Sequence, residues 1–178
     1  MEKFEKITEE MYYDDNYNLY DNLSQKVDIM IYGNCGDYRM MQEMALIDCE
    51  SPIEQLLSLE MENLNLKFIR EYNPYVDIVD IEKQVKIKCG KKSYRVDFLI
   101  PVIYKNRENK CFIIECDGYE FHQKTKEQVE KDNIRQRDLQ KEGYEVIRFS
   151  GTEIWHRPYD CAREILNIIL SYCNYKGE

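Results

Sequence analysis

The chain has 178 residues, 43% of them hydrophobic, and only 7 Gly and 4 Pro, which favours one folded domain with one substantial core. No apolar run approaches the roughly 20 residues that a transmembrane helix needs, and the acidic start MEKFEKITEE lacks the apolar core of a secretion signal. The seven cysteines are scattered and form no CxxC pair or zinc-type cluster, so we expect free thiols and a reducing, cytoplasmic location.

The formal net charge of −9 argues against a nucleic-acid partner only until its distribution is considered. Residues 1–60 contain 14 acidic and 4 basic residues, whereas residues 61–178 contain 20 acidic and 21 basic residues. Between Lys83 and Arg95 there are six basic residues and no acidic one. A local basic surface matters more for phosphate contact than the charge of the whole chain. DNA therefore stays among the expected partners.

Residues 1–50 are predicted to be an acidic N-terminal extension, and residues 51–178 the main domain. Within the extension, residues 27–32 resemble a strand and residues 38–47 a helix. Its acidic, tyrosine-rich segment MYYDDNYNLYDN would repel phosphate. We expect it to cover the DNA surface or to dock a protein partner, unless its tyrosines simply pack on the core.

The segment Ser51-Pro52-Ile53-Glu54 predicts the start of a helix, with serine as N-cap, proline in the first turn and glutamate as capping-box partner. The leucines that follow give this helix an apolar side. Glu54 either only caps the helix or also delivers a carboxylate to a functional site.

Residues 75–89 alternate as a strand does, and a hairpin follows, with strands at about 94–104 and 111–117 joined by the polar turn KNREN. Side chains alternate across a strand. Arg95, Asp97 and Leu99 are therefore expected on one face, and Val96, Phe98 and Ile100 on the other.

By the same rule Ile113, Glu115 and Asp117 share a face. If the antiparallel register brings Asp97 beside them, three carboxylates meet where an apolar strand ends. Like charges a few ångströms apart repel, and a hard divalent cation with oxygen ligands relieves the repulsion.

Three further elements are expected: a polar helix at about 125–142 ended by Gly143, a strand at 145–149 and an amphipathic helix at about 159–175. Asp132, Arg135 and Leu139 share one face of the polar helix, which is either solvated or turned toward a polar site. The order is then helix, three strands, helix, strand, helix.

That order, together with SPIEQLL, RVDFLI, IIECDGYEFH, DNIRQRDLQKEGYEVIRF and TEI, resembles the PD-(D/E)xK nuclease superfamily. The stretch from about 51 to 170 most closely resembles very-short-patch-repair-endonuclease-like domains. The resemblance implies an α/β, restriction-endonuclease-like core, αβββαβα, with a mixed central sheet flanked by helices. It also implies a Mg²⁺-dependent (or Mn²⁺-dependent) deoxyribonuclease that cuts or nicks DNA.

Carried over by position, the resemblance makes Asp97, Glu115 and the backbone carbonyl of Cys116 the metal ligands. Glu54, Asp117 and His122 join the two carboxylates as catalytic candidates, and Asp132 and Arg135 line the site, although a structural ion pair between these last two is as good an interpretation. Most of the superfamily has lysine where this chain has Asp117. The water is then activated by His122, by a displaced Lys124 or Lys126, or by the metal itself.

Five lysines are the expected DNA contacts: Lys86, Lys88, Lys92, Lys124 and Lys126. No zinc ligand follows His122, so specificity for a G·T mismatch is not implied. The competing interpretation is a catalytically weak nuclease-fold module that binds nucleic acid or a protein partner.

Overall fold

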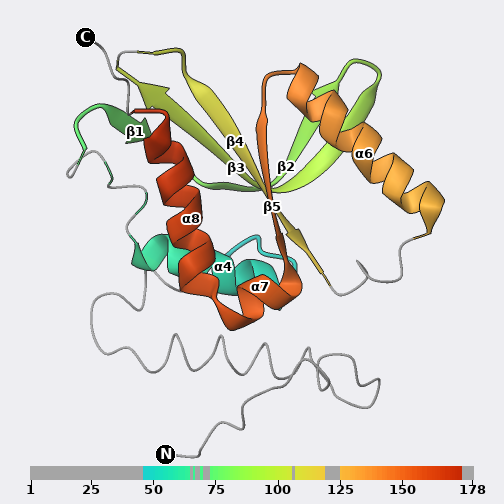
Figure 1. The fold of residues 1–178 in the computed structure, drawn as a ribbon, viewed down its shortest axis with the longest axis horizontal. Coiled ribbons are helices and arrows are strands. Elements are labelled where there is room, and N and C mark those ends of the chain that lie inside the picture. Colours follow the sequence, from blue (N-terminus) through green and yellow to red (C-terminus); the bar gives the residue numbers. More distant parts are fainter. Residues whose placement is uncertain are drawn as a thin grey trace, which may run out of the picture.

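The computed structural model describes residues 46–64, 66, 69, 73–105, 107–118 and 125–173 (Figure 1). The strand expected at 27–32 lies outside these residues, as does nearly all of the helix expected at 38–47 and of the extension as a whole. The elements in chain order are α4 (Pro52–Asn63), β1 (Val76–Ile78), β2 (Glu82–Cys89), β3 (Lys92–Tyr104), β4 (Lys110–Asp117), α6 (Lys126–Lys141), β5 (Glu145–Ser150), α7 (Gly151–His156) and α8 (Pro158–Ser171).

The helices begin where their capping residues stand. The Ser51 hydroxyl accepts from the backbone N–H of Glu54, and Thr125 and Gln128 form a capping box at the start of α6. Gly143, with a φ of +91°, follows the end of α6. The additional short helix α7 arises in the same way, because Ser150 and Glu153 form a second capping box.

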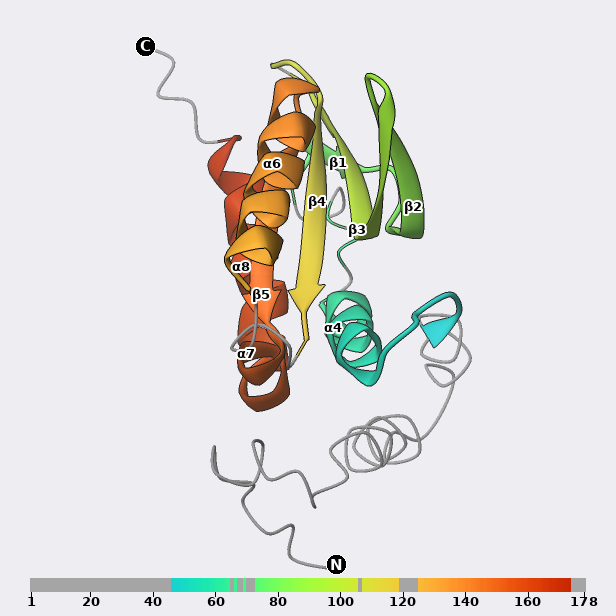
Figure 2. The same cartoon turned by 90° about the vertical axis from the view of Figure 1, so that its right-hand side faces the viewer.

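All five strands belong to one mixed sheet in the order β1-β3-β4-β5, with β2 also paired to β3. Strands β1, β2 and β4 run antiparallel to β3, and β5 runs parallel to β4. The connection between the two parallel strands contains α6 (Figure 2). The expected fold is confirmed: an α/β, mixed sheet flanked by helices. The stretch expected as one strand at 75–89 is divided into β1 and β2.

Alternate residues of β4 pack into two different cores. Phe112 and Ile114 belong to the main core with α4, α7 and α8, whereas Ile113 packs with Leu139 of α6. Because neighbouring residues of a strand point to opposite sides, α6 covers one face of the sheet, and the other three helices cover the opposite face. In Figure 2, α4 lies near the end at which β4 terminates.

The predicted alternation along β3 is wrong at Val96. Phe98 and Ile100 lie in the main core as expected, but Val96 packs with Leu99 in the second core. The neighbouring strand is irregular at the same place, where the ladder pairs Lys83 with Phe98 and Val85 with Val96 but omits the position between them. The residue there, Gln84, has a φ of +52°, so the strand geometry is irregular opposite Asp97.

The six cysteines in the described ranges are all free, and two of them, Cys89 and Cys161, are buried. Over the same ranges, the structure contains no helix that is both long and apolar enough to cross a membrane.

Candidate active site

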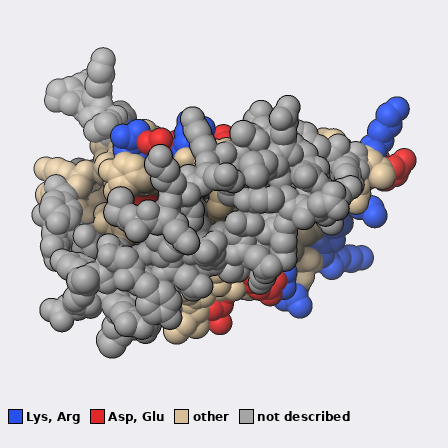
Figure 3. All heavy atoms as spheres, turned by 90° about the horizontal axis from the view of Figure 1, so that it is seen from below, with Lys and Arg blue, Asp and Glu red and all other residues tan. Residues whose placement is uncertain are grey.

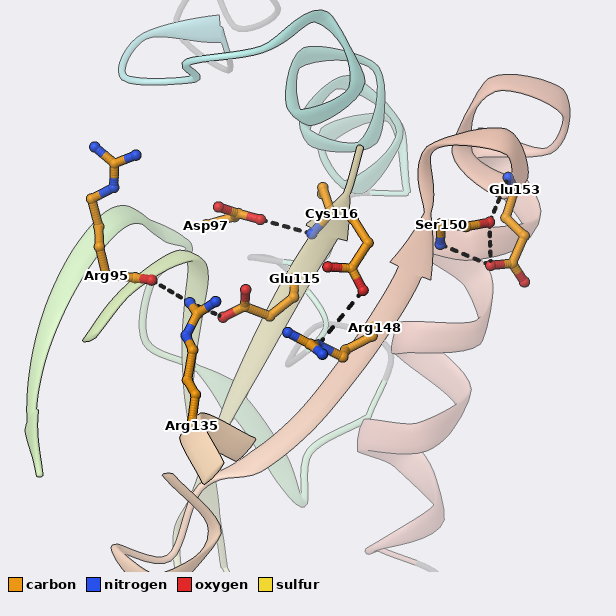
Figure 4. Close-up of polar contacts among 9 residues, drawn as sticks. Arg95, Asp97, Glu115, Cys116, Arg135, Arg148, Ser150 and Glu153 are labelled. Carbon is orange, nitrogen blue, oxygen red and sulfur yellow. Dashed lines mark hydrogen bonds and ion pairs between the residues drawn. The ribbon is translucent and has the colours of Figure 1, made fainter. Parts of the chain in front are cut away.

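The two central carboxylates meet between β3 and β4. The register pairs Phe98 with Ile114, which brings Asp97 to the level of Glu115 and Cys116. The Oδ2 atom of Asp97 accepts a hydrogen bond of 2.7 Å from the backbone N–H of Cys116 (Figure 4). The strand geometry therefore fixes the position of Asp97 relative to the strand that carries Glu115.

Glu115 is deeply buried, with 4% of its surface exposed. Its Oε1 atom lies 2.7 Å from a guanidinium nitrogen of Arg135, which reaches the site from α6 and also donates to the backbone carbonyl of Arg95 (Figure 4). Burial raises the pKa of Glu115 to about 7, against the lowering effect of Arg135, and the nearby Asp97 raises it further. One arginine does not compensate fully for the removal of this carboxylate from water.

Asp97 lies in a similar environment. Burial is the largest cause that raises the pKa of its carboxyl group, the Cys116 hydrogen bond lowers it, and the charges of Glu54 and Asp117 raise it again. The charges of Glu54 and Asp117 thus act on Asp97, and those of Asp97 and Asp117 act on Glu115. These carboxylates come from three separate elements: α4, β3 and β4.

Glu54 caps its helix and also lies close enough to Asp97 for its charge to act there. Its carboxylate accepts from the backbone N–H of Glu50 at 2.9 Å and from the Ser51 hydroxyl at 2.7 Å, so it caps α4. It also accepts from Nε2 of Gln84 at 2.7 Å, and its charge acts on Asp97. The cap therefore holds a buried carboxylate at the edge of the acidic site.

Arg148 joins the site from β5, where it is the parallel-strand partner of Glu115. Its Nε atom is 3.7 Å from Oδ2 of Asp117 (Figure 4). Sequence reasoning missed both Arg148 and Gln84. For Arg148 a signal was present, because a charged residue inside the apolar run Val146-Ile147-Arg148-Phe149 needs a reason, as Asp97 and Glu115 do.

The remaining expected site residues fall into two groups. His122 and Lys124 lie outside the described residues. Asp132 is half-buried on α6, one turn before Arg135, and Lys126 is exposed at the first position of that helix.

The expected DNA contacts on β2 and β3 are not equivalent. Lys86 and Lys88 are exposed, whereas Lys92 forms an ion pair of 2.9 Å with Asp138. On the face shown in Figure 3, Lys and Arg side chains gather on the right-hand side, where α6 lies in Figure 1.

The described residues include no group of three or more His, Cys, Asp or Glu side chains placed to hold a metal ion. The expected ligand set needs only two such side chains, Asp97 and Glu115, with a backbone carbonyl as the third donor. Hard oxygen donors whose pKa values are raised by burial and mutual repulsion suit Mg²⁺ or Mn²⁺. The donor chemistry therefore fits a divalent cation, with Arg135 already neutralising part of the charge.

The mixed sheet, its flanking helices and the acidic cluster between β3 and β4 define a restriction-endonuclease-like protein. The family model REase_MTES_1575 matches residues 74–169, more than half of the chain. The chain belongs to this restriction-endonuclease-like family. Comparison with curated proteins and with solved structures gave no match.

Proposed function

We propose that the protein is a Mg²⁺- or Mn²⁺-dependent endonuclease or nickase that hydrolyses phosphodiester bonds in DNA. The observation that carries the proposal is the meeting of half-buried Asp97 and buried Glu115, which repel each other, in a chain of a restriction-endonuclease-like family. Charged groups are rarely buried without a partner or a purpose, and here the only cation bonded to Glu115 among the described residues is Arg135.

In this proposal Asp97, Glu115 and the carbonyl of Cys116 hold the metal ion. When bound, the metal supplies a Lewis acid for the phosphoryl oxygen and a lowered pKa for water. The Cys116 N–H keeps Asp97 oriented, and Arg135 keeps Glu115 oriented. Glu54 stands at the side of the site, held by the cap and by Gln84, where it can orient the attacking water.

The finer assignments belong to the same proposal. We propose that the domain is related to very-short-patch-repair-like domains. We also propose that His122 is the catalytic acid/base and that lysines contact the DNA. Asp117 brings no positive charge to the position that lysine occupies in most of the superfamily. Activation of the attacking water is therefore assigned to His122, to Lys124 or Lys126, or to the metal, which would lower the pKa of water without accepting its proton.

Plasmid nicking with Mg²⁺, Mn²⁺ or a chelator tests the proposal. We expect conversion of supercoiled DNA to open or linear forms with metal, none with chelator, and none with Asp97→Asn. The competing function, a nuclease-fold module without catalysis, predicts DNA binding in a gel shift but no cleavage with any metal. Cleavage that persists undiminished in Asp97→Asn would contradict the proposed site.

A further inference from the structure

Arg148 is a cation whose Nε–H forms no hydrogen bond with any residue that the structure describes. Its side chain is 23% exposed, yet its Nε atom is shielded from solvent and has no hydrogen-bond partner among the described residues. The nearest carboxylate oxygen, on Asp117, is 3.7 Å away, which is too far for a hydrogen bond. A buried donor without a partner costs free energy, so its position calls for an explanation.

The position of Arg148 suggests what its partner is. In the parallel pair of β4 and β5 it stands beside Glu115, and its charge lowers the pKa of that residue. Figure 4 shows its guanidinium group next to the carboxylates, on the side away from Asp97. Because Arg148 and Glu115 are partners on adjacent strands, a phosphate that enters beside Glu115 would have this guanidinium as a neighbour.

Arg135 does not offer the same opportunity. Its guanidinium already donates to Glu115 and to the carbonyl of Arg95. A residue engaged in this way orients the site, whereas Arg148 is partly exposed and makes one ion pair, at 3.7 Å, with its shielded Nε atom. The two arginines thus differ in role although both flank Glu115.

We propose that Arg148 binds a non-bridging oxygen of the scissile phosphate and stabilises the charge that grows there during hydrolysis. The inference rests on the proposed nuclease function and names the cation that Asp117 does not provide. Guanidinium groups match phosphate geometry and remain charged at all relevant pH values. The ion pair with Asp117 holds Arg148 in place without occupying Nε by a hydrogen bond.

The reaction itself needs no further reactant. Water attacks phosphorus, the bond from phosphorus to the leaving deoxyribose oxygen breaks, and the products are a phosphomonoester and an alcohol. The proton lost by water passes to the base, and the leaving oxygen takes up a proton from solvent. Arg148 exchanges no proton in this scheme. It contributes a fixed positive charge, which is most effective where charge develops in the transition state.

The test compares Arg148→Met, Arg148→Lys and the control Arg163→Met, whose arginine forms an exposed ion pair with Asp160. Cleavage of a duplex oligonucleotide gives kcat and KM, and a melting curve with and without Mn²⁺ reports metal binding. We expect Arg148→Met to lower kcat by roughly a hundredfold or more with little change in KM and an intact Mn²⁺-induced rise in Tm. Arg148→Lys should recover part of kcat, and Arg163→Met should behave as the parent.

Three outcomes would overturn the inference, each in a distinguishable way. If the parent cleaves but Arg148→Met matches its kcat, the inference fails and the proposed function stands. If the parent cleaves DNA without any metal, both the inference about Arg148 and the proposed metal-dependent function fail. If Arg148→Met, Arg148→Lys and Asp117→Asn lose stability and activity in parallel, Arg148 is only a brace for Asp117.

Discussion

Asp97 accepts a 2.7 Å hydrogen bond from the backbone N–H of Cys116, so one of the two central carboxylates is fixed to the strand that carries the other, Glu115. An asparagine at this position keeps an oxygen for the same bond and removes only the charge. The same holds for glutamine in place of Glu115, which can still accept from Arg135. Neutral variants therefore test the charges of the site with its geometry retained.

We expect Asp97→Asn and Glu115→Gln each to lower cleavage by about a hundredfold or more, since the metal would lose a ligand charge. Both should also lose the rise in Tm that Mg²⁺ or Mn²⁺ produces in the parent. Without metal they should be at least as stable as the parent, because repulsion is relieved. Nicking assays and melting curves measure these effects, with exposed Glu108→Gln as control. Parental metal shifts in both variants would exclude the site.

The second prediction concerns the pH dependence of stability. Burial raises the pKa of Glu115 from 4.5 to about 7, so the folded chain holds this proton more tightly than the unfolded chain does. The contribution of Glu115 to the free energy of unfolding therefore falls as pH rises from about 4.5 to 7 and is constant above that, a loss on the order of 3 kcal/mol. Asp97, whose pKa is also raised, acts in the same direction.

Urea unfolding of the metal-free parent and of Glu115→Gln across this pH range isolates the effect. The difference in unfolding free energy between the two proteins should grow with pH in favour of the variant, because only the parent must ionise a buried carboxyl group. Curves that stay parallel from pH 4.5 to 7 would show that Glu115 has an ordinary pKa in the folded state.

The third prediction separates DNA contacts from structural lysines. Lys86 and Lys88 are exposed, so replacing each by glutamine should weaken binding of all DNA sequences alike and reduce the salt slope of binding by roughly one unit per residue. Lys92→Gln, whose lysine pairs with Asp138, is the matched control and should change the slope less. Gel shifts across a salt series measure the slope. An unchanged slope in the Lys86 and Lys88 variants would show that DNA binds at another surface of the protein.

The fourth prediction concerns an acidic contact just before α4. Both oxygens of Glu50 bind the guanidinium of Arg95, at 2.8 and 2.6 Å, and Lys83 donates to the carbonyl of Ile47. Residues 46–50 thus engage two members of the basic segment 83–95. If the basic segment binds DNA, as we propose, Glu50 would compete with phosphate for Arg95.

Glu50→Gln should therefore release Arg95 and raise the affinity for DNA at low salt, with a gain that shrinks as salt is added. The pair is exposed on both sides, so stability should change little. Fluorescence anisotropy with a labelled duplex measures the affinity, and Glu164→Gln, on the exposed side of α8, controls for the change in net charge. Equal gains in both variants would mean that only net charge matters.

The sequence predicted most elements because local signals specify them: capping residues for α4 and α6, alternation for the hairpin, and Gly143 at the end of α6. Asp97 and Glu115 were recognisable because a charge inside an apolar strand is unusual. Local patterns carry no information on which distant strand becomes the parallel neighbour of β4. The position of Arg148 beside Glu115 could therefore be found only from the three-dimensional structure.

The irregularity at Gln84 was hidden for a different reason. Glutamine has no special preference for a positive φ, so the residue type does not predict the irregular backbone at this position. On the neighbouring strand β3, Val96 turns to the second core at the same place. A position whose backbone is set by its surroundings cannot be recognised from its own identity.

The positive φ of Gln84 also affects how the protein can be stabilised. Glycine adopts this conformation without steric cost, so Gln84→Gly should relieve strain on the order of 1 kcal/mol. The same change removes the amide that holds Glu54 and the buried Oε1 atom that has no partner. The relief of strain therefore opposes the loss of a hydrogen bond to a buried carboxylate, and if the acidic site is catalytic as proposed, selection for activity keeps the strained glutamine.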